Sequence, residues 1–81
     1  MFSRELFGER LKESRRGCGE TQTDLGALLG ISKSQVSEME HGSASTTVEK
    51  VAVICAHYNV SADYLLGLTD DPAPYKRRPE E

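Results

Sequence analysis

The sequence has few of the features that tie a small protein to a metal, a membrane or an oxidising compartment. Its two cysteines, Cys18 and Cys55, are too few for a disulfide framework and lack the spacing of a zinc site, so we expect free thiols and no metal. No apolar run approaches the ~18 residues of a membrane-spanning helix. The charged residues 1–6 are unlike a signal peptide. We therefore expect a cytoplasmic protein without a membrane segment.

Basic residues do not dominate the composition. Ten Lys and Arg residues stand against thirteen Asp and Glu residues, for a net charge of -3, so nucleic-acid binding would have to come from a local surface. A chain of 81 residues can bury one small core at most, which excludes a two-domain enzyme. The sequence contains no nucleophile motif and no glycine-rich phosphate loop. We expect no catalysis, no cofactor and no small-molecule substrate.

Apolar residues recur at helical spacing in five segments, and no segment has the pattern of a strand. We predict helices at residues 2–16, 22–29, 32–41, 48–58 and 61–66, most of them ended by a glycine. Residues 70–81 hold all three prolines and many charges, which is typical of an extended tail, so the predicted domain spans residues 1–69. The basic run 76–78 is either a solvated part of this tail or a contact to DNA or a partner.

The second and third predicted helices carry clear start and stop signals. Thr21 with Asp24, and Ser32 with Gln35, have the spacing of a capping box. Gly30 stands between the helices, where a tight turn needs a residue with positive φ. Two short helices joined in this way form a helix-turn-helix unit, whose second helix lies in the major groove of DNA.

The apolar pattern also predicts the core. Gly26 provides a small residue where two helices cross closely, and Asn59 can take a left-handed cap. The residues expected to be buried are Phe2, Leu6, Phe7 and Leu11 in the first helix, Leu25, Leu29, Ile31, Val36 and Met39 in the helix-turn-helix unit, and Val48, Val51, Ala52, Cys55 and Tyr58 in the fourth helix.

Residues 7–67 resemble the lambda-repressor-like helix-turn-helix family, which includes phage repressors and Cro-type proteins. The phrases that carry the resemblance are FGERLK at 7–12, TQ at 21–22, LGIS at 29–32, VSEMEHG at 36–42 and VSADYLLG at 60–67. They cover about three quarters of the chain. The resemblance implies an all-α fold, a compact five-helix lambda-repressor-like DNA-binding domain.

The resemblance also implies DNA contacts in the helix-turn-helix unit. Gln22 matches a family position whose side chain and adjacent amide hold a DNA phosphate, at a helix end that favours anions. Lys33 and Ser34 match base-reading and backbone-contacting positions at the front of the third helix. Ser37 and Glu38 match further positions that face the groove.

A second phosphate clamp is implied at the start of the fourth helix, formed by Thr46 and Thr47 with Ser43 and Ser45 in the preceding loop. The family's usual basic residues are missing there. Helical periodicity independently places four residues of the third helix opposite its buried side, namely Ser34, Ser37, Glu38 and His41. For each polar residue the alternative is a solvated helix turn, and for His41 it is a charge complement to the helix end.

Two further expectations concern the packing of the first helix. The resemblance pairs Glu40 with Arg15 as a structural ion pair. Glu20 stands where the family usually has an apolar residue, commonly Leu, immediately before the Thr-Gln pair. We expect Cys18 to fill the space that this residue leaves.

The sequence therefore predicts a sequence-specific, double-stranded DNA-binding transcriptional regulator of phage or prophage repressor type, acting as a homodimer on a palindromic operator. The apolar residues around Tyr64, Leu65, Leu66 and Leu68 are candidates for the dimer contact, with ordinary core packing as the alternative. A second hypothesis keeps the fold but assigns it to a protein-binding module, such as an antitoxin-like or anti-repressor partner. The acidic net charge is compatible with that reading.

Overall fold

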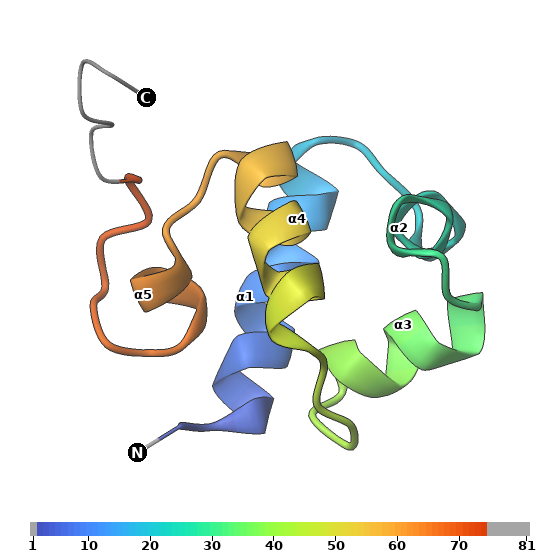
Figure 1. Ribbon diagram of the computed structural model, residues 1–81, viewed down its shortest axis with the longest axis horizontal. Coiled ribbons are helices and arrows are strands. Elements are labelled where there is room, and N and C mark those ends of the chain that lie inside the picture. The colour runs from blue at the N-terminus through green and yellow to red at the C-terminus, as the bar shows by residue number, and fades with distance from the viewer. Residues whose placement is uncertain (1, 75–81) are drawn as a thin grey trace.

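The computed structural model describes residues 2–74, which form five helices and no strand. The helices are α1 (Arg4–Gly17), α2 (Gln22–Leu29), α3 (Lys33–Glu40), α4 (Val48–Tyr58) and α5 (Ala62–Leu65). Helices α2 and α3 lie on one side of α1 and α4, and α5 lies on the other (Figure 1). The predicted all-α, five-helix architecture is confirmed, while the basic run 76–78 lies outside the described residues.

Helix α1 begins later than predicted. Ser3 is its N-cap, and the Ser3 hydroxyl accepts a hydrogen bond from the amide of Leu6. Phe2 therefore lies outside the helix and is 45% exposed, with its ring centroid 6.0 Å from that of Phe7. The expectation that Phe2 is buried was wrong. The apolar spacing includes Phe2, but the Ser3 cap makes the helix begin after it.

The predicted signals at the helix-turn-helix unit are confirmed. Thr21 with Asp24 and Ser32 with Gln35 each form a complete capping box. Gly30 ends α2 with φ of 70°, a left-handed conformation that glycine adopts without steric cost. These local bonds fix where α2 ends and where α3 begins.

The core lies between the helices and is formed by Phe7, Leu11, Leu25, Val36, Met39, Ile54, Tyr58 and Leu65. The prediction for α4 was partly wrong: Val48 is 82% exposed and Ala52 is exposed, whereas Ile54 is completely buried. Helix α4 is apolar on most of its sides, so spacing alone could not select the inner face. Contacts with the other helices select the row that contains Val51, Ile54, Cys55 and Tyr58.

Two glycines allow close backbone approaches around α3. A Cβ atom on Gly8 of α1 would lie 2.5 Å from the carbonyl oxygens of Met39 and Glu40. A Cβ atom on Gly26 would lie 2.6 Å from the carbonyl oxygen of Ile31, in the turn before α3. The expected need for a small residue at Gly26 is confirmed, and Gly8 provides a second such contact that sequence spacing did not reveal.

Arg10 holds the segment after α5 against α1. Its Nη1 donates to the carbonyl oxygens of Tyr64 and Thr69, the latter at 2.8 Å, and its Nη2 lies 2.9 Å from Oδ1 of Asp70. The guanidinium also lies 4.1 Å from the centre of the Tyr64 ring. In the same region Leu65 is part of the core, whereas Leu68 is 69% exposed. None of the helices within residues 2–74 has the length and apolarity to cross a membrane.

The close approach at Gly8 predicts an unusual response to alanine. Gly8→Ala should lower the free energy of unfolding by about 1–3 kcal/mol, because its methyl group would overlap the backbone of α3. Gly17→Ala, in the same helix with no atom near its Cβ position, should leave stability unchanged or raise it by up to about 1 kcal/mol. Urea denaturation measures both, and equal stability of the two variants would contradict the close packing of α1 on α3.

Candidate nucleic-acid interface

Helix α3 presents one polar side to solvent. Val36, Met39 and Glu40 are buried, whereas Lys33, Ser34, Gln35 and Glu38 are exposed and Ser37 is half-buried. The outward placement predicted from periodicity for Ser34 and Glu38 is confirmed. The side chains of the first turn of α3 are exposed, so a duplex could approach this turn from outside.

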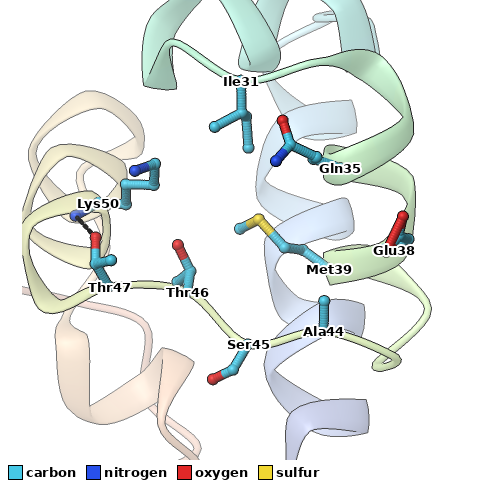
Figure 2. Close-up of a pocket in the computed structure, with 9 residues that line it drawn as sticks. All are labelled: Ile31, Gln35, Glu38, Met39, Ala44, Ser45, Thr46, Thr47 and Lys50. Carbon is cyan, nitrogen blue, oxygen red and sulfur yellow. Dashed lines mark hydrogen bonds between the residues drawn. The ribbon is translucent and has the colours of Figure 1, made fainter.

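A groove of about 240 Å³ runs between α3 and the start of α4. Its lining residues are Ile31, Gln35, Glu38, Met39, Ala44, Ser45, Thr46, Thr47 and Lys50 (Figure 2). The hydroxyl of Thr47 accepts from the amide of Lys50 at 3.2 Å, which caps α4. No basic residue was predicted for the second phosphate clamp, but Lys50 lies in the wall of this groove, one helical turn after the Thr47 cap.

His41 and Ser43 close the end of α3. Nδ1 of His41 lies 2.7 Å from the carbonyl oxygen of Ser37 and 3.4 Å from its hydroxyl. Because a carbonyl oxygen only accepts, Nδ1 carries the proton in this contact. The Ser43 hydroxyl donates to the carbonyl oxygen of Glu38 at 3.1 Å. Both side chains serve the helix end, and their contacts to DNA stay predictions.

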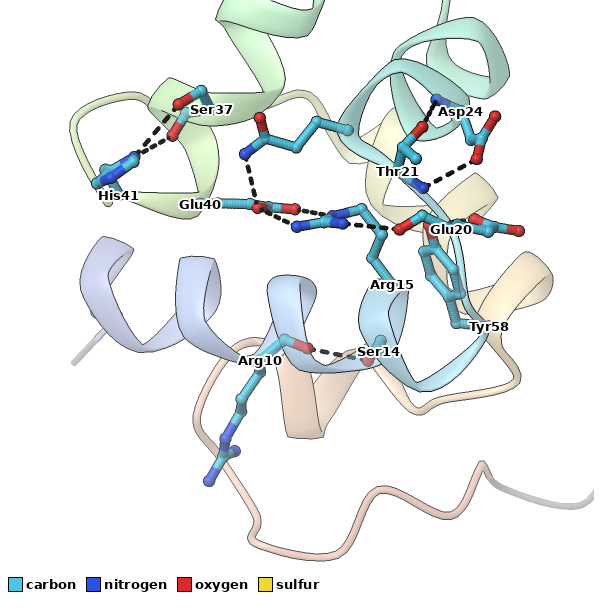
Figure 3. A network of polar contacts seen from close by, with 11 residues as sticks. Arg10, Ser14, Arg15, Glu20, Thr21, Asp24, Ser37, Glu40, His41 and Tyr58 are labelled. Carbon is cyan, nitrogen blue, oxygen red and sulfur yellow. Dashed lines mark hydrogen bonds and ion pairs between the residues drawn. The ribbon is translucent and has the colours of Figure 1, made fainter.

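A buried ion pair joins α1 to α3 (Figure 3). Nε of Arg15 lies 2.7 Å from Oε2 of Glu40, and Nη2 lies 3.0 Å from Oε1. The two residues are 7% and 6% exposed. Burial alone would raise the pKa of Glu40, but hydrogen bonds from Arg15 and Gln22 outweigh it and hold that pKa below its usual value. The expected Arg15–Glu40 pair is confirmed.

Gln22 belongs to the same network. Its Nε2 donates to Oε1 of Glu40 at 3.1 Å, and its side chain is half-buried. An amide nitrogen carries two protons, so a second N–H is left to donate to another acceptor. The structure thus positions Gln22 at the start of α2 through Glu40, and the predicted phosphate contact would use the remaining N–H.

The Glu20 carboxylate bonds to polar groups of α4, at a position where apolar packing is usual in the family. Its carboxylate lies 2.7 Å from Nε2 of His57 and accepts from the Tyr58 hydroxyl at 2.8 Å. The contact with His57, followed by that with Tyr58, lowers the pKa of Glu20. Cys18 is exposed, so the expectation that it fills this junction was wrong. The donors to Glu20 come from the end of α4, 37 and 38 positions further along the chain.

A second cleft, of about 530 Å³, lies beside the start of α2. It is lined by Lys12, Arg15, Arg16, Glu20, Thr21, Gln22, Thr23 and Lys33. No function was predicted for Lys12 and Arg16, although their spacing of four residues places them on one side of a helix. Within residues 2–74, no three His, Cys, Asp or Glu side chains gather in a way that could hold a metal ion.

Two short helices joined by a left-handed glycine turn, with the second helix exposing a polar side, define a helix-turn-helix domain. The chain belongs to the helix-turn-helix domain family, which residues 6–68 match, and within it to the lambda-repressor-like type. A similar solved structure is that of the P22 c2 repressor in complex with a synthetic operator, at 28% identity and a TM-score of 0.68, covering 74% of this chain and 91% of the repressor chain.

Two similar proteins are longer than this chain. The uncharacterized HTH-type transcriptional regulator YobD of Bacillus subtilis is 36% identical over 73 residues, which are 90% of this chain and 65% of YobD. The antitoxin PezA of Streptococcus pneumoniae is 31% identical over 62 residues, which are 76% of this chain and 39% of PezA. The chain thus spans less than two thirds of the length of either relative.

Removing one partner of the buried pair should be costly. Arg15→Met would leave the Glu40 carboxylate buried with Gln22 as its one side-chain hydrogen-bond donor, and the free energy of unfolding should fall by about 3–5 kcal/mol. The matched control Arg16→Met, at the exposed neighbouring position, should change it by less than about 0.5 kcal/mol. Thermal or urea unfolding measures both variants, and a loss of similar size in each would show that the pair does not hold α1 to α3.

The lowered pKa of Glu40 predicts how acid acts on the protein. The unfolded chain titrates Glu40 near its ordinary pKa of about 4.3, whereas the folded protein does so at lower pH. The stabilisation from the carboxylate is therefore complete above that ordinary value and is lost as the pH falls through the folded-state pKa. Urea titrations from about pH 7 to about pH 3 should show the stability gap between wild type and Glu40→Gln narrowing with acid. A gap that stays constant would contradict this assignment.

Proposed function

We propose that this chain is a sequence-specific, double-stranded DNA-binding transcriptional regulator of phage repressor type, with no catalytic activity. The observation that carries the proposal is the exposed polar side of α3, which is anchored to the globule by Val36, Met39 and Glu40. Family membership supports it, as does the similarity to YobD, a transcriptional regulator, and to the P22 c2 repressor in complex with an operator. A cytoplasmic location follows from the same proposal.

In this function α3 enters the major groove. Lys33 donates to guanine O6 and N7 or to a phosphate, and Ser34 and Ser37 can donate or accept at either kind of site. Glu38 only accepts, most naturally from cytosine N4. Near the phosphates an unpartnered carboxylate is repelled, so Glu38 would select sequence by penalising bases that offer no donor.

Phosphate contacts on both sides of α3 would fix its position along the duplex. On one side the second N–H of Gln22 is available at the start of α2. On the other side Thr46 and Lys50 lie in the groove between α3 and α4. Ser43, Thr47 and His41 complete the proposed DNA-binding set, although each of them also bonds to the protein's own backbone.

We propose a two-fold dimer on a palindromic operator, because one helix reads only a few base pairs and two half-sites about 34 Å apart raise affinity and specificity together. Leu65 belongs to the core and is not available for this contact. Leu68 is exposed, and Tyr64 and Leu66 are half-buried, so these three of the four predicted residues remain candidates for the contact.

A second candidate function is a protein-binding module with the same fold. The similarity to the antitoxin PezA favours it, and so does the net charge of -3. In that case α3 or the exposed residues near Leu68 would contact another protein. The two functions differ in what the polar side of α3 recognises, so DNA selection separates them.

Selection of bound sites from random duplex DNA should enrich a palindromic sequence with half-sites one helical turn apart. On that sequence Lys33→Ala should weaken binding by about 1–3 kcal/mol, because a base-edge or phosphate contact is lost. Arg4→Ala is the matched control, because it removes an exposed positive charge at the start of α1. Absence of any enriched sequence would contradict the regulator function, and a protein retained through α3 would favour the second candidate.

A further inference from the structure

The cleft beside the start of α2 gathers positive charge from two helices. Lys12 and Arg16 come from the second half of α1, and Lys33 is the first residue of α3. In a chain with a net charge of -3, a cleft with three such cations is a local departure from the overall composition. The cleft is open and about 530 Å³ in volume, which leaves room for a ligand.

The other charged residues of the cleft are already engaged. The Arg15 guanidinium bonds to Glu40 and to the carbonyl oxygen of Glu20. The Glu20 carboxylate bonds to His57 and Tyr58. Glu20 keeps its negative charge in these contacts, but this one carboxylate is outnumbered by the three remaining cations of the lining.

The side chains of Lys12, Arg16 and Lys33 make no hydrogen bond or ion pair with another residue in the described range 2–74, although the charge of Lys12 also acts on the Glu40 carboxylate. Lys12 and Arg16 are four residues apart on α1, a spacing at which like charges repel across one helical turn. Glu9 and Glu13 line a neighbouring hollow with Lys12 and Arg16, and each stands three residues before one of these cations, which offsets part of the repulsion although no ion pair forms. An anion in the cleft would relieve the rest.

We propose that Lys12 and Arg16 bind a phosphodiester group of the DNA backbone, so that α1 is part of the DNA-binding surface. The inference rests on the proposed function, because it extends the same interface. Lys33 connects the two regions, since it stands at the front of α3 and also lines the cleft. A phosphate held there would lie next to the helix that enters the groove, and contacts of this kind position the protein without reading sequence.

The test uses a double variant, Lys12→Gln with Arg16→Gln, in the full chain. Its affinity for the selected duplex should fall at least about tenfold at low salt, and by a similar factor for a scrambled duplex, because phosphate contacts are independent of sequence. The slope of log K against log salt should become shallower by about 1, since each phosphate contact contributes about 0.9. The base preference found by selection should be unchanged.

Two controls separate charge from folding. Arg4→Gln removes an exposed cation from the other end of α1 and should leave affinity and salt slope at wild-type values. Lys12→Arg with Arg16→Lys keeps both charges and should retain most of the affinity. Equal thermal midpoints for all variants establish that the losses are not due to unfolding.

The outcomes distinguish this inference from the function on which it rests. If wild type selects a sequence but the double variant binds it with the same affinity and salt slope, α1 does not contact the backbone and only this inference is overturned. If the variant changes the preferred bases, its residues read sequence, which also overturns it. If wild type selects no sequence, the proposed function fails and the inference fails with it.

Discussion

The ion pair between Arg15 and Glu40 links the three elements on which the candidate interface depends. Arg15 lies on α1, Glu40 ends α3, and Gln22 at the start of α2 bonds to the same carboxylate. Next to this pair, Gly8 allows the backbone of α1 to approach that of α3. The ion pair and the close backbone packing therefore stabilise the same contact between α1 and α3. Together they set the orientation of α3 relative to α1, and they determine which side of α3 faces solvent.

A negatively charged chain can still present a cationic surface, because its charges are unevenly distributed. Glu40 and Glu20 are bonded to partners within the protein, and Asp24 caps α2. The cations Lys33 and Lys50 line hollows on either side of the exposed residues of α3. Net charge describes long-range attraction, whereas DNA contact depends on the groups within a Debye length of the phosphates, about 10 Å at 0.1 M salt.

Features that depend on neighbours in the chain could be predicted from sequence. The capping boxes at Thr21 and Ser32 and the left-handed turn at Gly30 need only residues a few positions away, and each was predicted correctly. The outward side of α3 followed from its periodicity, since Val36 and Met39 leave one choice of buried face. The Arg15–Glu40 pair is 25 positions apart and was predicted only through family resemblance.

The remaining features depend on contacts between distant segments, which spacing does not encode. Helix α4 is apolar on most sides, so its inner row could be chosen only by the helices that pack on it. Glu20 is satisfied by donors from the end of α4, which no local pattern indicates. The basic cleft escaped prediction for a related reason: Lys12 and Arg16 are ordinary charged positions of α1 until the fold brings Lys33 beside them.

The central claim is that the polar side of α3 is the surface that recognises DNA, and a nuclear magnetic resonance titration tests it most directly. Isotope-labelled protein would be titrated with the duplex obtained by selection, and backbone amide shifts followed residue by residue. The largest changes are expected in α3 and at the start of α2. Changes confined to α5 and the segment around Leu68, with α3 unperturbed, would contradict it.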